Sequence, residues 1–400
     1  MSFIKISKSI LVLFVSVQLL GSIALADTPL YSIDNSNYQS HSSKLSPGQM
    51  GMFEKYSDYR MDVYSASPSC KLPDSIAAIS KTNGSMINSN EGIEVPNAGQ
   101  RPFPNPTEAQ HFIWNYRMNP GYTAFVHRFG TTYGVNSTGA VTIGKTDNYI
   151  SFPNNPGIEN KVSDSNIYAL YMQKNLEPAR VSGGVTLVHD FIDNVVQPRK
   201  AWQYSPATRR VRRAPDITYD TLLDQGGGIV TVDQYGSFNG AQDRHNWEYR
   251  GSKTMIVVYN NFDVMNAGSS LASTKNFPNP DVMRYEERTV HEVHGAVKSG
   301  SRHLYAGRTM FFTDDDMNWL AEQNMYDGQG NLMRIMVSPQ TSNNAGFCRG
   351  VAEITMDYAT QTYVANNVFG ESHSGVLPIY NTGEPSSTFY TPDGLRRFAR

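Results

Sequence analysis

The sequence predicts a mainly β protein of the α+β class, in which a few short helices lie against one large curved antiparallel sheet. The three helices expected from apolar residues at helical spacing all lie before residue 120. Beyond that point the chain runs in short segments rich in Tyr, Val, Thr and Phe, broken by Gly, Asn, Asp and Pro, as in consecutive hairpins. The 23 Tyr and 18 Phe also favour a sheet, because aromatic side chains pack well on a pleated surface.

The N-terminus has the form of a cleavable secretory signal. Lys5 and Lys8 precede an apolar run at 10–20, and Ala24-Leu25-Ala26 follows before the first acidic residue, Asp27. We therefore expect the first 26 residues to be a signal peptide and the mature protein to work in the periplasm. Because no cysteine follows the cleavage site, we expect no lipid anchor.

Three helices are expected near the start of the mature chain. Residues 27–45 are polar and without periodicity, so we predict a flexible leader there and a single domain over 46–400. Ser46-Pro47-Gly48-Gln49 has the form of a capping box and opens the first helix. The second helix is expected over 73–81, and the third opens at Asn105-Pro106-Thr107-Glu108.

The strands are expected to follow one another in the sheet in sequence order, and a sheet of this size tends to curl. They are predicted at Tyr122–Phe129, Tyr149–Phe152, Ile167–Gln173, Gly184–Phe191, Lys200–Tyr204, Trp247–Tyr259, Tyr285–Val297, His303–Phe312, Trp319–Tyr326, Leu332–Val337 and Ala352–Asn366.

The two cysteines, Cys70 and Cys348, are expected to form one disulfide, because an exported protein folds in an oxidising compartment. Such a bridge would stabilise the fold by at most roughly 4–5 kcal/mol in the chain-entropy model. Two separate buried thiols are the alternative.

Charge and motifs exclude several classes of function. The 34 Lys and Arg against 36 Asp and Glu lack the basic excess of a general nucleic-acid binder. His291 and His294 are three apart, whereas a helical zinc pair needs four. Gly370–Gly375 misses the Gly-x-Ser-x-Gly pattern, and the Asp314–Asp316 run reads as a solvated turn. We therefore expect no metal, no cofactor and no enzymatic activity.

One stretch concentrates positive charge among aromatic residues. A hairpin turning at 205–208 would place Trp202 and Tyr204 on one face, because they are two apart in a strand. We expect these two to line an apolar cavity, with Phe112, Ile113 and Trp114 of the third helix on its lid side. The cations are expected at the rim, facing an anionic headgroup or an acidic partner: Arg199, Lys200, Arg209, Arg210, Arg212 and Arg213. The alternative is a solvated hairpin paired with Asp193, Asp216 and Asp220.

The same stretch carries a family resemblance. The run from Lys200 to Pro215, followed by Tyr219-Asp220-Thr221, closely resembles the central motif of an uncharacterised proteobacterial family, often labelled outer-membrane lipoprotein-sorting proteins. The resemblance implies a fold similar to the carriers LolA and LolB, an incomplete barrel with helices as a lid over an apolar cavity. It also implies partnership with exporters of the resistance-nodulation-division type and with outer-membrane proteins, and it supplies no catalytic residues.

The sequence thus favours a periplasmic carrier that binds a hydrophobic cargo, such as a lipid or a lipoprotein acyl chain, with peripheral membrane contact. A non-carrying assembly factor that docks an exporter or an outer-membrane protein is the alternative. A hydrolase is a third hypothesis, and hydrolysis of lipid esters would distinguish it.

Overall fold

The computed structural model describes residues 28–82, 85–94, 101–118, 124–153, 166–214, 219–223, 227–342, 346 and 348–400. The expected signal peptide lies outside them. Within them, no helix has both the length and the apolar character needed to cross a membrane.

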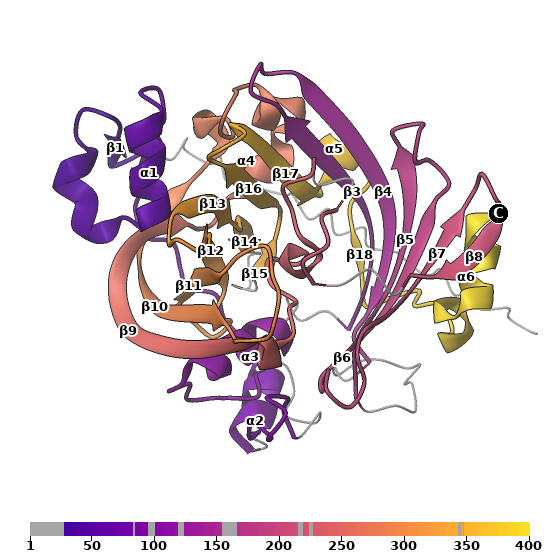
Figure 1. Ribbon diagram of the computed structural model, residues 1–400. Coiled ribbons are helices and arrows are strands. Elements are labelled where there is room, and N and C mark those ends of the chain that lie inside the picture. Colours follow the sequence, from indigo (N-terminus) through magenta and orange to yellow (C-terminus); the bar gives the residue numbers. More distant parts are fainter. Residues whose placement is uncertain are drawn as a thin grey trace, which may run out of the picture.

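A 16-stranded sheet dominates the fold, and Figure 1 shows it curling without closing into a barrel. Its order is β1-β2-β10-β11-β12-β13-β16-β17-β3-β4-β5-β6-β7-β8, with β9 paired to β10 and β18 to β3. Neighbouring strands are antiparallel apart from β2 and β10. The expected fold class is therefore confirmed.

The predicted strands are all present, and the segment expected at Ala352–Asn366 forms two of them, β16 and β17. The sheet strands are β1 (Tyr31–Ile33), β2 (Met61–Tyr64), β3 (Phe125–Val135), β4 (Val141–Ser151), β5 (Ile167–Glu177), β6 (Val185–Phe191), β7 (Lys200–Ser205), β8 (Arg210–Arg213), β9 (His245–Val258), β10 (Tyr285–Val297), β11 (Gly307–Thr313), β12 (Leu320–Tyr326), β13 (Leu332–Val337), β16 (Glu353–Asp357), β17 (Thr362–Val368) and β18 (Ile379–Tyr380). A second, two-stranded sheet consists of β14 (Gln340–Ser342) and β15 (Cys348–Gly350).

The three predicted helices are α1 (Pro47–Lys55), α2 (Asp74–Thr82) and α3 (Ala109–Met118). The capping box of α1 is present: the Ser46 hydroxyl accepts from the Gln49 backbone N–H, and the Gln49 side chain accepts from the Ser46 N–H. Three further helices were not predicted, namely α4 (Phe262–Asn266), α5 (Glu371–Ser374) and α6 (Pro392–Ala399).

The segment expected to be a flexible leader is instead part of the fold. It contains β1 and a 3-10 helix over Tyr38–Lys44. Ile33 and Leu45 are buried in the same apolar cluster as Met52 and Phe53 of α1. Two buried apolar residues therefore hold this otherwise polar segment to the fold. Each stabilises the folded state by roughly 1.5–3 kcal/mol when fully buried.

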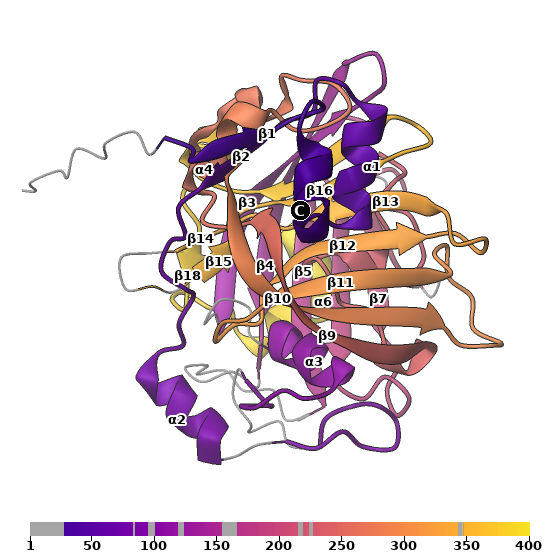
Figure 2. The same ribbon diagram turned by 90° about the vertical axis from the view of Figure 1, so that its left-hand side faces the viewer.

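The helices cover both faces of the sheet. Helix α1 packs on the convex face, where Gly48 meets Asn324 and Ile335 of β12 and β13. Helix α3 lies on the concave face, with Phe112 stacked on His291 of β10, and Figure 2 shows it crossing β9 and β10. Only α3 therefore occupies the position expected of a lid.

Helix α6 covers the outer face of β5, β6 and β7, beside the free end of the sheet (Figure 1). Its Leu395 is fully buried, in one apolar cluster with Leu170, Met172 and Leu187. The helix begins at Thr391, whose side chain accepts from the Gly394 N–H, and has Pro392 in its first turn. Helix α6 therefore shields the apolar outer face at the free end of the sheet from water.

Candidate functional site

A groove of about 610 Å³ opens between the concave face of β5–β8 and residues 221–223 and 232–239. Its volume falls within the range of roughly 300–1,000 Å³ that is usual for ligand pockets. The groove is larger than two other cavities, of about 290 and 130 Å³, so we take it as the candidate site.

The two walls of the groove differ in polarity. The sheet wall is mainly polar, since alternate inward positions hold Gln173, Asn175, Thr186 and Gln203, together with Tyr171 and Val188. The opposite wall presents Leu222, Leu223 and Val232. The expectation of a wholly apolar cavity is therefore wrong. The apolar positions of β5–β7 point outward instead, where α6 covers them.

Trp202 and Tyr204 do not lie in the groove. They share one face of β7, as predicted, but that face packs in the cluster with Leu395 and Phe398. Gln203, between them, lines the groove. The prediction that Trp202 and Tyr204 share one face of the strand is correct. The prediction that this face lines the cavity is wrong, because α6 packs against it and no local pattern predicts that contact.

The three α3 residues are core residues. Phe112 and Ile113 are fully buried against β9–β11. Trp114 is buried in another cluster, and its indole N–H donates to the Glu91 carbonyl over 3.3 Å. Their neighbours Tyr116 and Arg117 are the α3 residues that line a cavity.

A second cavity, here called the inner cavity, has a volume of about 130 Å³ and adjoins the groove. The two cavities share Tyr171, Tyr235 and Asn239 in their linings. Aromatic side chains dominate the walls, including Phe152, Tyr168, Trp319, Phe369 and Tyr380.

Arg199 lines the groove and also belongs to a buried ion pair. Its Nη2 lies 2.9 Å from Asp190 Oδ2 and donates to the Asn239 side-chain oxygen over 2.7 Å. Asp190 is 1% exposed and also lies 3.7 Å from Arg117. Neither Asp193 nor Asp220, which we considered as partners of the cationic stretch, forms this pair, and Asp216 lies outside the described residues.

Three guanidinium groups line the inner cavity together with one carboxylate. The cations are Arg117, Arg128 and Arg349, and the acid is Glu353. Burial raises the pKa of Glu353 to about 7, against the opposing charge of Arg128 and hydrogen bonds from Asn367. Around neutral pH this carboxyl is therefore only partly ionised, and positive charge predominates in the cavity wall.

The segment over 229–239 fills the concave side of β11–β16 with polar contacts. Asp233 accepts from Arg308 over 2.5 Å and contacts His303 at 3.1 Å. Burial alone would raise the pKa of Asp233, but the Arg308 guanidinium and His303 hold it well below its usual range. Arg334 donates to the Ile229 carbonyl over 2.6 Å. We call residues 229–239 the plug.

The four arginines of the β7–β8 hairpin are exposed, as expected. The hairpin forms, with β7 and β8 paired from Trp202–Arg213 to Ser205–Arg210. Arg209, Arg210, Arg212 and Arg213 are exposed, and Arg212 lines the groove. Lys200 is half-buried, with its Nζ 5.0 Å from the centre of the Phe191 ring.

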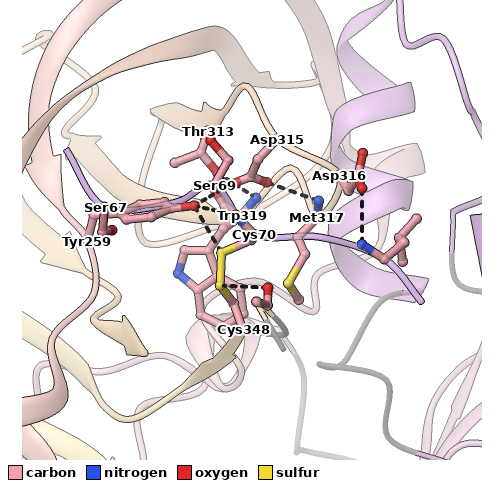
Figure 3. Close-up of a disulfide and its surroundings, with 12 residues drawn as sticks. Ser67, Ser69, Cys70, Tyr259, Thr313, Asp315, Asp316, Met317, Trp319 and Cys348 are labelled. Atoms are coloured by element: carbon pink, nitrogen blue, oxygen red, sulfur yellow. Dashed lines mark hydrogen bonds between the residues drawn. A yellow bond between two sulfur atoms is a disulfide. The ribbon is translucent and has the colours of Figure 1, made fainter. Parts of the chain in front are cut away.

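The predicted disulfide is present and joins the segment before α2 to β15 (Figure 3). The Tyr259 hydroxyl accepts from the Cys70 N–H over 2.8 Å and donates to Asp315 over 2.9 Å. Asp316 accepts from the Leu72 N–H. The acidic turn over 314–316 is therefore an anchor for this segment and more than a solvated corner.

The other motifs have structural roles among the described residues. His291 stacks on Phe112 and contacts Tyr249 and Asp314, while His294 contacts Thr309. No group of three or more possible metal ligands occurs in the described part of the chain. Gly370–Gly375, expected to be a loop, holds the short helix α5.

Two parts of the site were missed by the sequence analysis, α6 and the plug. A signal for α6 exists in Thr391-Pro392, an N-cap followed by proline, with Leu395 and Phe398 at helical spacing. The plug has a local signal as well, the capping box of Thr231 and Gln234. Its place against the sheet has none, because the sheet-side partners of Asp233 and Gln234 lie 70 or more positions away.

Comparisons with known proteins agree with the resemblance seen in the arginine-rich run. An uncharacterized protein of Pseudomonas aeruginosa is 32% identical over 382 residues, covering 93% of this chain and 82% of that protein. A solved domain from Vibrio parahaemolyticus described as outer membrane lipoprotein-sorting has 10% identity and a TM-score of 0.47, covering 68% of this chain and 92% of its own. A LolA superfamily protein from Nitrosomonas europaea has 10% identity and a TM-score of 0.44, covering 72% and 100%. The model of one family matches residues 32–396. The chain therefore belongs to the family described as protein of unknown function (DUF1329).

Proposed function

We propose that this protein is a periplasmic carrier that holds an amphiphilic molecule, such as a lipid or a lipoprotein acyl chain, in the groove. The observation that carries the proposal is the open groove of about 610 Å³, whose lining combines polar side chains on the sheet with Leu222, Leu223 and Val232 opposite them. A purely hydrophobic cargo would remove water from the exposed Gln203 side chain and from the rest of the polar sheet wall, which is costly. An amphiphile can place its polar part against the polar side chains of the sheet and its apolar part against Leu222, Leu223 and Val232.

The energetics suit reversible binding. Each buried methylene contributes roughly 0.8 kcal/mol, so ten of them contribute roughly 8 kcal/mol before the cost of ordering the chain. A binding energy of that size corresponds to a dissociation constant of about 1 μM. Cargo would then be retained during transfer and released to an acceptor that buries more of it.

A charge placed on the apolar wall should weaken cargo binding. Leu222 is 43% exposed and lines the groove, so Leu222→Asp should leave the fold intact and lower the affinity for a fluorescent fatty-acid analogue by about tenfold. Leu304 is 39% exposed and lines neither the groove nor the inner cavity, so Leu304→Asp is the matched control. Titration of the delipidated proteins measures the difference. Equal affinities, or no saturable binding by the parent protein, would rule out the carrier.

We also propose that the free end of the sheet contacts an anionic surface. Strand β8 ends the sheet, and its arginines form no ion pair among the described residues. Helix α6, which packs beside β7 and β8, adds exposed Arg396 and Arg397. Each cation near an anionic membrane contributes about 1 kcal/mol. An acidic exporter or outer-membrane partner is the alternative, and that docking role belongs to the assembly-factor hypothesis.

Replacing Arg209, Arg210, Arg212 and Arg213 together by Gln should reduce binding to vesicles that contain anionic lipid by at least about tenfold at low salt. The melting temperature should change little, since exposed charges contribute little to stability. Co-sedimentation with anionic vesicles measures the loss, and neutral vesicles are the control. A melting temperature lowered by more than about 5 °C would show that these arginines serve the fold instead.

A further inference from the structure

We infer that the inner cavity binds an anionic group, a carboxylate or a phosphate, through Arg117 and Arg128. This inference rests on the proposed function in one respect, namely that the apolar part of the same ligand lies in the groove. It goes beyond that function by assigning the ligand a charge and a direction, with the head inward and the tail toward the groove.

The first argument is the balance of charge. Arg117, Arg128 and Arg349 line the cavity, and Glu353 is the one carboxylate in the described lining. Asp190 lies close by, but Arg199 engages both of its oxygens, at 3.4 Å and 2.9 Å. Buried cations need a counter-charge, since an unpaired buried charge costs several kcal/mol. The described residues do not supply enough negative charge, and an anionic ligand would.

The second argument is the set of unused donors. The Arg117 side chain is fully buried, and its Nη1 donates to the Gly240 carbonyl over 3.2 Å. Its Nη2 has only a long ion-pair contact, 3.7 Å from Asp190 Oδ2. Arg117 Nε and Nη2, and the Nε of Arg128, are buried with no hydrogen-bond partner among the described residues. Buried donors are nearly always satisfied in folded proteins, so unsatisfied ones on a cavity wall indicate an acceptor that binds there.

The third argument is the way these guanidinium groups are held. Arg117 Cζ lies 4.7 Å from the centre of the Trp114 ring and 4.8 Å from that of Tyr168. Arg128 Cζ lies 4.5 Å from that of Phe369. Stacking uses the flat face of a guanidinium and leaves its N–H edge free for the bidentate contact that carboxylates and phosphates make.

The size of the cavity limits what enters it. At about 130 Å³ it is close to the roughly 150 Å³ of an engineered cavity that admits benzene. It therefore accommodates a head group and not a long chain. The remainder of the ligand would pass Tyr171 and Tyr235, which the inner cavity shares with the groove.

The test compares ligands that differ only in the head group. Isothermal titration calorimetry with the full mature chain measures dodecanoate, dodecan-1-ol and benzoate. The protein should bind dodecanoate at least about tenfold more tightly than the alcohol, since charge-assisted hydrogen bonds contribute roughly 1.5–3 kcal/mol. Arg128→Gln should remove this preference and leave binding of the alcohol nearly unchanged. Arg302 is exposed and lines neither the groove nor the inner cavity, so Arg302→Gln removes the same charge elsewhere and should keep the preference.

A second variant covers the case in which Arg128→Gln fails to fold. Arg128→Gln with Glu353→Gln removes one positive and one negative group together, and it should also lose the preference for the acid. Equal binding of acid and alcohol by the parent protein would overturn the inference and leave the carrier standing. Binding of benzoate without either long-chain ligand would support the anion site and overturn the carrier. No binding of any of the three would overturn both.

Discussion

Replacing Cys70 and Cys348 together by Ala should lower the free energy of unfolding by about 3–5 kcal/mol. The disulfide joins residues 278 positions apart, so its loss greatly enlarges the conformational freedom of the unfolded chain. Both cysteines are buried, at 1% exposure, in the cluster that contains Phe112 and Phe312. The variant therefore also loses packing where α3 meets the sheet. Chemical unfolding followed by circular dichroism measures the change.

The parent protein treated with a reductant during unfolding is the control for this variant, because it loses the same bond without any substitution. Its midpoint should move in the same direction as that of the double variant. An unchanged midpoint in both would show that the segment before α2 is held by its hydrogen bonds to Asp315 and Asp316 and that the bond between the sulfurs adds nothing.

Asp233→Asn should destabilise the protein by about 3–5 kcal/mol, because it leaves the fully buried Arg308 without its counter-charge. The pKa of Asp233 is held well below its ordinary range. A carboxyl with a lowered folded-state pKa stabilises the fold above its unfolded pKa of about 4, and this contribution is lost as the pH falls through the folded value. The deficit of the variant should therefore be full at pH 7 and shrink in strong acid.

A double variant, Asp233→Asn with Arg308→Met, separates the uncompensated charge from the lost hydrogen bonds. It should recover part of the stability, since replacing both members of a buried pair costs much less than removing one. Guanidinium chloride unfolding of the parent and of both variants at pH 7 gives the three values. A single variant as stable as the parent would mean that the plug is not fixed to the sheet through this pair.

The sequence was most informative where structure depends on neighbouring residues. The longer strands, the α1 capping box and the β7–β8 hairpin are set by local patterns and were predicted, whereas the short strands β1, β2, β14, β15 and β18 were not. The face of each strand that lines the groove was not predicted. Trp202 and Gln203 lie on opposite faces of β7, and which face is covered depends on where α6 packs. The prediction of Arg199 as a rim cation misses its ion pair, because its partner Asp190 lies on the neighbouring strand. Which residues pair across two strands depends on their register, which no local pattern gives.

The covering of β5–β7 by α6 also bears on the order in which the protein can fold. Ribosomes deliver chains from the N-terminus, and early segments begin to collapse first. The residues that bury Leu170, Met172 and Leu187 are made after every strand of the sheet. Until they arrive, this apolar surface faces water in the nascent chain, beside an edge strand that is open to wrong pairing. This part of the sheet is therefore where a chaperone would be needed longest.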